Sequence, residues 1–217
     1  GGRLAEPETS EVYELGLKAE YDTFSVNLAV FEQAVKDFQT NVLTGTSGRI
    51  LANADKQAST GLEIEATWLP IDNLVLSFAG TFLDAEYESF PDSAFGDLTG
   101  RTPAGIPEIS TSTSFQYSFD VQGRDAFARA DWQHDEGAAY TDNAPLQDLI
   151  GVTRDFDLVN ASAGFSTENG INVSVWGRNI FGEEYFTNVF TPLFESTSLA
   201  GFPNQPATYG ITVRKTF

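Results

Sequence analysis

The chain alternates apolar and polar residues along many short segments, and this two-residue period constrains its fold more than any other feature. In the last stretch, ATYGITVRKTF, Tyr209, Ile211 and Val213 fall on one side, while Gly210, Thr212 and Arg214 fall on the other. Alternation of this kind predicts a β-strand with one apolar and one polar face. Helical periodicity is scarce, so we expect an all-β protein.

The connections between these segments alternate between short turns and long polar loops. Strands are expected at 12–21, 24–30, 61–68, 74–87, 110–119, 125–134, 156–165, 171–180 and 207–217. Long loops are expected at about 39–57, 88–108, 135–155 and 181–206. Short turns therefore lie at one end of an antiparallel sheet and long loops at the other, as in transmembrane β-barrels.

An aromatic residue ends each strand that runs toward the short turns, in phase with its apolar face. These residues are Tyr21, Trp68, Phe119, Phe165 and Phe217. Amphipathic rings at one height predict a girdle where a barrel meets the membrane–water interface. A soluble β-sandwich also alternates, but it would scatter its aromatics and would not sort loop lengths by end. The pattern favours the membrane barrel.

Composition narrows the possible chemistry. The net charge of −19 argues against a nucleic-acid partner, and the absence of Cys excludes thiolate metal sites. His134 is the only histidine, so a His-rich metal site cannot form. It could act as the base of an outer-membrane lipase, but no serine is marked as a nucleophile by its context. We therefore predict no catalytic, metal or cofactor residues and a protein that is not an enzyme.

Five segments, in order, resemble the C-terminal half of TonB-dependent outer-membrane receptors. They are ETSEVYELGLKAEY, STGLEIEATWLPIDNLVLSFAGTFLDAEY, GRTPAGIPEIS, WGRNIFGEEYF and PATYGITVRKTF. The resemblance implies an antiparallel barrel of 22 strands with an N-terminal plug in its lumen, in the outer membrane of a Gram-negative bacterium. Residues 1–217 would form one partial domain holding nine C-terminal strands, and nothing in them matches the plug.

The same resemblance implies a function and partners. The family takes up scarce nutrients, most often ferric siderophores, with energy from a TonB-type periplasmic partner acting on the N-terminal part. Lipopolysaccharide, outer-membrane lipid and a small-molecule nutrient are the other expected partners. A passive porin-like channel and a soluble all-β binding module are the alternatives. The acidity of this half weighs against an anionic catecholate siderophore.

Strand parity and the chain end carry two further expectations. Bacterial barrels have even strand numbers and both termini on the periplasmic side, whereas nine strands place the termini on opposite sides. We therefore expect at least one strand before residue 1. The alternating end resembles the signal that the barrel-assembly machinery reads, carried by Tyr209, Ile211, Val213 and Phe217. Phe217 could also be only a girdle residue.

Two groups of residues are candidates for contact with a ligand. Arg129, Asp131 and Arg178 face the polar side, where they could line the transport path, contact the plug or form structural ion pairs among neighbouring strands. Phe95, Tyr140, Phe190 and Phe194 lie in the long loops, where aromatic rings could stack on a flat ligand. Alternatively, these acidic loops keep the exposed end soluble or bridge lipopolysaccharide through divalent cations.

Overall fold

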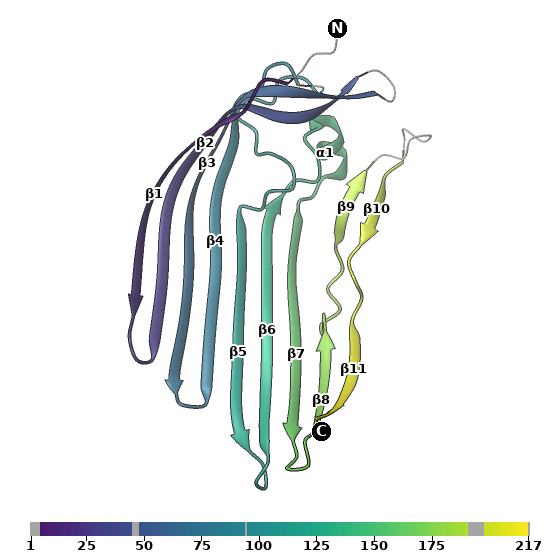
Figure 1. The fold of residues 1–217 in the computed structure, drawn as a ribbon. Helices are drawn as coiled ribbons and strands as arrows, with labels where there is room; N and C mark the ends of the chain where they lie inside the picture. Colours follow the sequence, from purple (N-terminus) through teal and green to yellow (C-terminus); the bar gives the residue numbers. More distant parts are fainter. Residues whose placement is uncertain (1–4, 45–47, 94, 191–197, 217) are drawn as a thin grey trace.

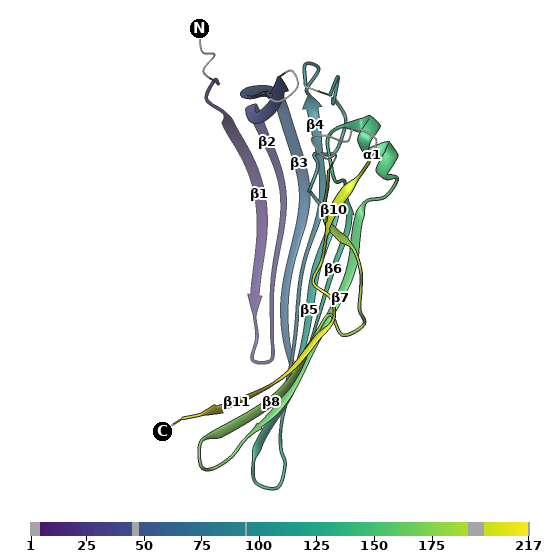
Figure 2. The same cartoon turned by 90° about the vertical axis from the view of Figure 1, so that its right-hand side faces the viewer.

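The fold is a single curved antiparallel sheet that forms an open trough. The computed structural model describes residues 5–44, 48–93, 95–190 and 198–216. Nine strands pair in the order β1-β2-β3-β4-β5-β6-β7-β8-β11 (Figures 1 and 2). They are β1 (Thr9–Glu20), β2 (Phe24–Thr44), β3 (Gly48–Ile71), β4 (Leu74–Ser89), β5 (Ile109–Asp120), β6 (Asp125–Ala138), β7 (Arg154–Ser166), β8 (Ile171–Arg178) and β11 (Thr208–Lys215). The predicted nine-stranded sheet is confirmed.

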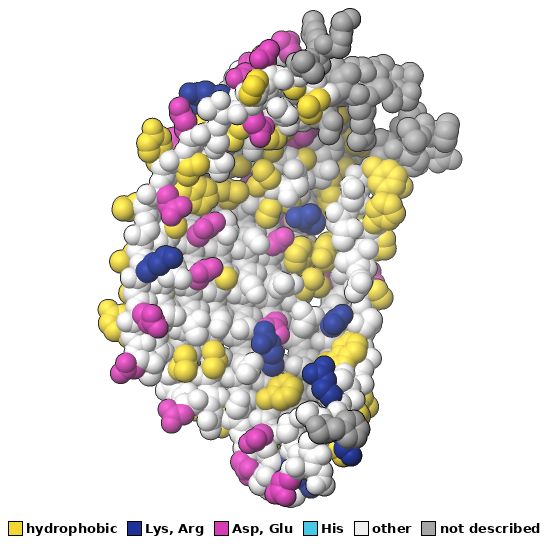
Figure 3. Space-filling model, viewed as in Figure 1, with side chains coloured by type: hydrophobic (Ala, Val, Ile, Leu, Met, Phe, Trp, Pro, Cys, Tyr) yellow, Lys and Arg dark blue, Asp and Glu magenta, His cyan; other side chains and the backbone are white. Residues whose placement is uncertain are grey.

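The two faces of the sheet differ in polarity as the alternation predicts. The convex face is apolar and largely uncovered: Leu15 is 75% exposed, Ile211 72% and Val175 51%. The concave face, seen in Figure 3, is mainly polar, with acidic side chains prevailing over β1–β3 and most of the basic ones over the other side of the sheet. Soluble monomers rarely expose so much contiguous apolar surface, so the convex face argues against a soluble module.

Three of the four predicted long loops contain regular structure. Residues 39–57 are not a loop, because β2 and β3 stay paired up to Thr44 and Gly48. The 135–155 segment contains helix α1 (Ala144–Ile150), and the 181–206 segment contains the hairpin of β9 (Phe186–Phe190) and β10 (Ala200–Pro203). Only 88–108 is irregular, as predicted. Among the described residues, no helix has the length and apolar character to cross a membrane.

The extended β2–β3 hairpin bends over the long-loop end of the sheet (Figure 1). The pairing skips Asp37 and the opposite residue Asp55, so the register is the same in the pairs Lys36–Lys56 and Phe38–Ala54 on either side. Asp37 has a left-handed backbone with φ of 56°, so β2 departs from regular extended geometry at this residue. Beyond the bend, Phe38 packs against a cluster of buried side chains from β4 and the loop after it. The cluster consists of Tyr87, Phe90 and Leu98.

Two reciprocal aromatic–glycine pairs set the register of β11 against β8. On the concave face, the Trp176 ring lies against Gly210, and its Nε1 donates to Thr212 Oγ1 at 3.1 Å. On the convex face, the Tyr209 ring lies against Gly177, and its hydroxyl donates to the Ile180 carbonyl at 3.0 Å. Each ring needs a partner without a side chain, so a shifted register would place a Cβ under a ring.

We expect Gly210→Ala to destabilise the full-length protein by about 1–3 kcal/mol, because a Cβ there would overlap the Trp176 ring. Gly16→Ala is the matched control: it also lies within a strand, and its added Cβ would make only ordinary contacts, with the Leu28 carbonyl oxygen at 3.5 Å and Glu14 Oε1 at 3.9 Å. Urea unfolding in lipid vesicles measures both variants. Equal effects of the two substitutions would show that the Trp176–Gly210 contact does not hold the register.

Candidate functional site

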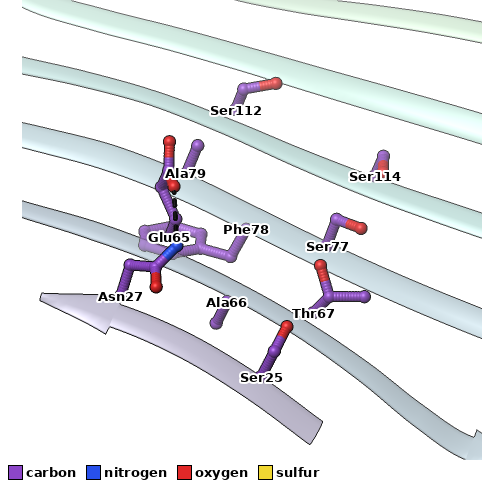
Figure 4. Close-up of a pocket in the computed structure, with 10 residues that line it drawn as sticks. All are labelled: Ser25, Asn27, Glu65, Ala66, Thr67, Ser77, Phe78, Ala79, Ser112 and Ser114. Atoms are coloured by element: carbon purple, nitrogen blue, oxygen red, sulfur yellow. Dashed lines mark hydrogen bonds between the residues drawn. The ribbon is translucent and has the colours of Figure 1, made fainter. Parts of the chain in front are cut away.

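The middle of the concave face has a shallow polar hollow between β2 and β5. Its volume is about 280 Å³, and Asn27 Nδ2 donates to Glu65 Oε2 across it at 3.1 Å (Figure 4). Hydroxyl side chains line the rest: Ser25, Thr67, Ser77, Ser112 and Ser114. Glu65, which accepts from Asn27, is the one titratable group among these lining residues. His134 on β6 is not one of them and lies near Asp157, with Nδ1 3.1 Å from Oδ1. The hollow therefore resembles a smooth polar wall rather than a catalytic site.

The predicted path residues Arg129, Asp131 and Arg178 do not form one cluster. Arg129 holds Asp131 with two hydrogen bonds, Nη2 to Oδ1 at 2.6 Å and Nε to Oδ2 at 2.9 Å. Arg178, two strands away on β8, lies 5.3 Å from the ring of Trp176. Arg129 and Asp131 thus form an ion pair within β6, whereas the alternative from the sequence was ion pairing among neighbouring strands. Their role along a transport path stays a prediction.

A second group of side chains gathers higher on the concave face, where β6 and β7 reach the long loops. Phe156 and Tyr185 stack with ring centroids 4.4 Å apart and planes 15° apart. Arg154 Nη2 lies 3.7 Å from Asp135 Oδ2, and Ser110 Oγ donates to Asp135 Oδ1 at 2.7 Å. We call Asp135, Arg154, Phe156 and Tyr185 the rim cluster. It borders a hollow of about 350 Å³ lined by residues of β4–β7.

The rim cluster has hydrogen-bond donors to spare. The 3.7 Å between Arg154 and Asp135 is too long for a hydrogen bond. Among the described residues, Arg154 Nε has no acceptor and the Tyr185 hydroxyl makes no hydrogen bond. Buried polar groups in proteins are normally paired. A guanidinium and a phenol without acceptors, beside two stacked rings, are suited to bind a flat molecule that carries oxygen acceptors.

Burial keeps the phenols of Tyr185 in the rim cluster and of the nearby Tyr140 protonated. Burial of the Tyr185 hydroxyl raises its pKa above the ordinary value, with Arg154 lowering it and Asp135 raising it further. Burial likewise raises the pKa of Tyr140, on which the charge of Arg154 also acts. Tyr140 donates its hydroxyl to the Phe186 carbonyl at 3.2 Å. Both tyrosines are therefore neutral donors at physiological pH.

Asn179 holds the segment that carries Tyr185. Asn179 is 5% exposed and ends β8 with a left-handed φ of 49°. Its side chain accepts from Glu183 N at 2.8 Å and donates to the carbonyls of Glu183 at 2.8 Å and Gln205 at 3.1 Å. Asn204 continues the attachment by accepting from Tyr185 N at 3.1 Å. These bonds place Tyr185 against Phe156 on the neighbouring strand.

The long loops are tied to one another through Asp142. Its Oδ1 accepts from Ala104 N at 2.8 Å, and its Oδ2 accepts from the Tyr87 hydroxyl at 3.4 Å. Asp142 belongs to the β6–β7 connection, whereas Ala104 and Tyr87 belong to the β4–β5 connection and its strand. The carboxylate therefore joins the two loops.

The four predicted loop aromatics have different surroundings. Phe95 packs against the buried Tyr87–Phe90–Leu98 cluster, so its ring takes part in loop packing. Tyr140 lies near the rim cluster, and Phe190 packs on Phe202 with centroids 5.4 Å apart. Phe194 lies outside the described residues. Of the four, Tyr140 is the one that the structure brings to the candidate site.

The predicted girdle and assembly residues lie at strand ends and on the convex face. Tyr21 is 71% exposed, Trp68 49% and Phe165 37%. Phe119 stacks on Tyr117, with centroids 5.5 Å apart. Phe217 lies outside the described residues. Tyr209, Ile211 and Val213 are 67–72% exposed, as a lipid-facing strand requires. Their roles in the membrane and in assembly stay predictions.

Sequence reasoning missed Phe156 and Tyr185, which form the centre of the rim cluster. One signal was available: Phe156 is out of phase, since it falls on the same side of β7 as Asn160 and Ser162. An aromatic residue on a polar face has no membrane or core to cover it. Tyr185 carried no such signal, because its position depends on hydrogen bonds to Asn204 rather than on strand period.

Comparison with known proteins agrees with this architecture. The family model described as TonB dependent receptor-like, beta-barrel, matches residues 1–180. The ferric yersiniabactin uptake receptor FyuA from Yersinia pestis is similar, with a TM-score of 0.78 and 22% identity over 97% of this chain and 30% of that one. The ferric citrate transporter FecA in its unliganded form has a TM-score of 0.70 and 17% identity over 95% of this chain and 31% of that one. The copper transporter OprC has a TM-score of 0.71 and 14% identity over 99% of this chain and 32% of that one.

A curved antiparallel sheet with a polar inner face, an apolar outer face and loops sorted by length is the wall of an outer-membrane type of β-barrel. The chain belongs to the TonB-dependent receptor β-barrel family. This family consists of transport receptors of Gram-negative outer membranes. The similarity to solved structures establishes the fold, and the chain spans about a third of the length of those proteins.

We expect Asn179→Asp to loosen the segment that carries Tyr185, because a carboxylate would face the Glu183 and Gln205 carbonyls in place of an N–H donor. Loss of two buried hydrogen bonds should cost about 1–3 kcal/mol and speed amide exchange in residues 180–186. Asn188→Asp is the control, since Asn188 is exposed. Unchanged exchange in Asn179→Asp would contradict the assignment of Asn179 as the anchor of this segment.

Proposed function

We propose that residues 1–217 form part of the barrel wall of an outer-membrane active transporter that takes up a scarce small-molecule nutrient. The observation that carries the proposal is the rim cluster: two stacked rings and unpaired donors at the long-loop end of a TonB-dependent receptor barrel wall. The relatives described as taking up ferric yersiniabactin, ferric citrate and copper support a metal complex, such as a ferric siderophore, as the nutrient.

In this proposal the rim cluster captures the ligand from outside the cell. The ring face of Phe156 and Tyr185 would hold a flat part of the ligand, and Arg154 would donate to its oxygen atoms. The serine-rich wall below the cluster offers weak, evenly spaced hydroxyl contacts, which suit passage better than tight binding. A plug elsewhere in the full-length protein would close the lumen, and its rearrangement, driven by a TonB-type partner, would release the ligand inward.

The remaining partners follow from the two faces of the sheet. Outer-membrane lipid would cover the convex apolar face, and lipopolysaccharide would surround its upper, acidic margin through divalent cations. The barrel-assembly machinery would recognise the alternating end that includes Tyr209, Ile211 and Val213. On this proposal, residues 1–217 form a single partial domain of the receptor.

Replacement of either stacked ring should weaken ligand binding by the full-length receptor. For Phe156→Ala and Tyr185→Ala we expect a loss of about 0.5–1.5 kcal/mol, which is about twofold to tenfold in Kd for a ferric siderophore complex that the receptor binds. Phe181→Ala is the control, since Phe181 is 78% exposed and lies outside the stack. An equal loss in Phe181→Ala would argue against a specific role for the stack.

Active transport and passive diffusion predict different responses to loss of energy. We expect cells that lack the TonB-type partner to keep surface binding of the ferric complex but to lose its uptake. Radiolabelled iron measures both steps on the same cells. Uptake that continues without the partner would favour the porin-like alternative.

A further inference from the structure

The loops around the rim cluster carry a large excess of negative charge. Segments 88–108, 135–155 and 181–206 contain twelve Asp and Glu residues and two arginines, Arg101 and Arg154. Arg154 is offset by Asp135, whose carboxylate lies 3.7 Å away. Acidic side chains continue on the concave face across the sheet, at Glu63 and Glu65 of β3. A molecule that approaches the cluster therefore enters a negative potential, which attracts cations and repels anions.

The immediate surroundings of the stacked rings have the opposite preference. Arg154 and Tyr185 present N–H and O–H donors, and neither donates a hydrogen bond to another described residue. Donors require acceptors, so the part of the ligand that reaches the rings must carry oxygen or nitrogen lone pairs. The donors at the rings therefore favour a ligand with hydrogen-bond acceptors, whereas the negative potential around them disfavours a ligand with a net negative charge.

We propose that the ligand of the rim cluster is a metal complex with a flat part, oxygen acceptors and a net charge that is zero or positive. This inference rests on the proposed transport function and specifies its substrate class. A metal cation makes the combination possible, because it neutralises the oxygens that bind it while leaving others as acceptors. Strongly anionic complexes, such as a ferric tris-catecholate, match the donors but not the surrounding potential.

The test compares binding of three ferric complexes to the full-length receptor in lipid vesicles. The probes are a cationic ferric trihydroxamate, a neutral ferric trihydroxamate and a trianionic ferric tris-catecholate. We expect the cationic or neutral complex to bind at least about tenfold more tightly than the trianionic one. The difference should shrink as salt is raised, because the Debye length falls from about 10 Å at 0.1 M to about 3 Å at 1 M.

A variant with fewer negative charges at the long-loop end separates the effect of charge on affinity from the effect of ligand shape. Asp92→Asn, Asp148→Asn and Glu184→Gln together remove three exposed carboxylates at the long-loop end that take part in no hydrogen bond or ion pair among the described side chains. We expect the affinity for the trianionic complex to rise and that for the cationic complex to fall, each by about threefold or more. The matched control, Asp22→Asn, Asp72→Asn and Glu168→Gln, makes the same charge change in the short turns.

The outcomes distinguish this inference from the function on which it rests. If the trianionic complex binds most tightly, or if both triple variants shift the affinities equally, the charge rule is wrong while the receptor function stands. If none of the three complexes binds or enters cells, the proposed uptake of ferric complexes fails and the charge rule fails with it. Opposite shifts in the rim variant alone support the inference.

Discussion

The whole structure depends on the register of hydrogen bonds between antiparallel strands. Side chains in a strand alternate with a period of two, so a slip of one residue would exchange the polar and apolar faces of that strand. In lipid the backbone has no water with which to pair, which makes an unpaired strand costly. The two aromatic–glycine pairs between β8 and β11 help to fix this register. Trp176 and Tyr209 each cover a glycine of the opposite strand, which has no side chain to block the ring.

The sheet could be predicted from sequence because its cause is local and repeated. The nine strands, their order and their two faces follow from alternation and from the sorting of short and long connections. The long-loop end could not be predicted in the same way. Residues 39–57 lack the strict apolar–polar alternation of the other strands, yet 39–44 and 48–57 belong to β2 and β3. Outside the membrane, a strand needs no apolar face, and the signal on which the prediction relied disappears.

The candidate site shows the same limit at the level of single residues. Arg129 and Asp131 could be selected from the sequence because charged residues are conspicuous within a strand, and in the structure Arg129 donates hydrogen bonds to Asp131. The rim cluster depends on contacts between residues far apart in sequence, such as Tyr185 with Phe156 and Arg154 with Asp135. Hydrogen bonds of Asn179 and Asn204 hold the segment that carries Tyr185, and such bonds have no period to detect. Only Phe156, an aromatic residue on the polar side of its strand, left a trace.

The links between the long loops have a mechanical consequence. Phe38, next to the left-handed residue Asp37, packs against the cluster that includes Tyr87 of β4, and Asp142 fastens the next loop to that same region through Tyr87 and Ala104. Three connections that emerge separately from the sheet are therefore braced into one body. A push on any one of them is passed to the other two, so the mouth of the trough should tilt or shift as a unit, with Tyr140 carried along, rather than open as independent flaps.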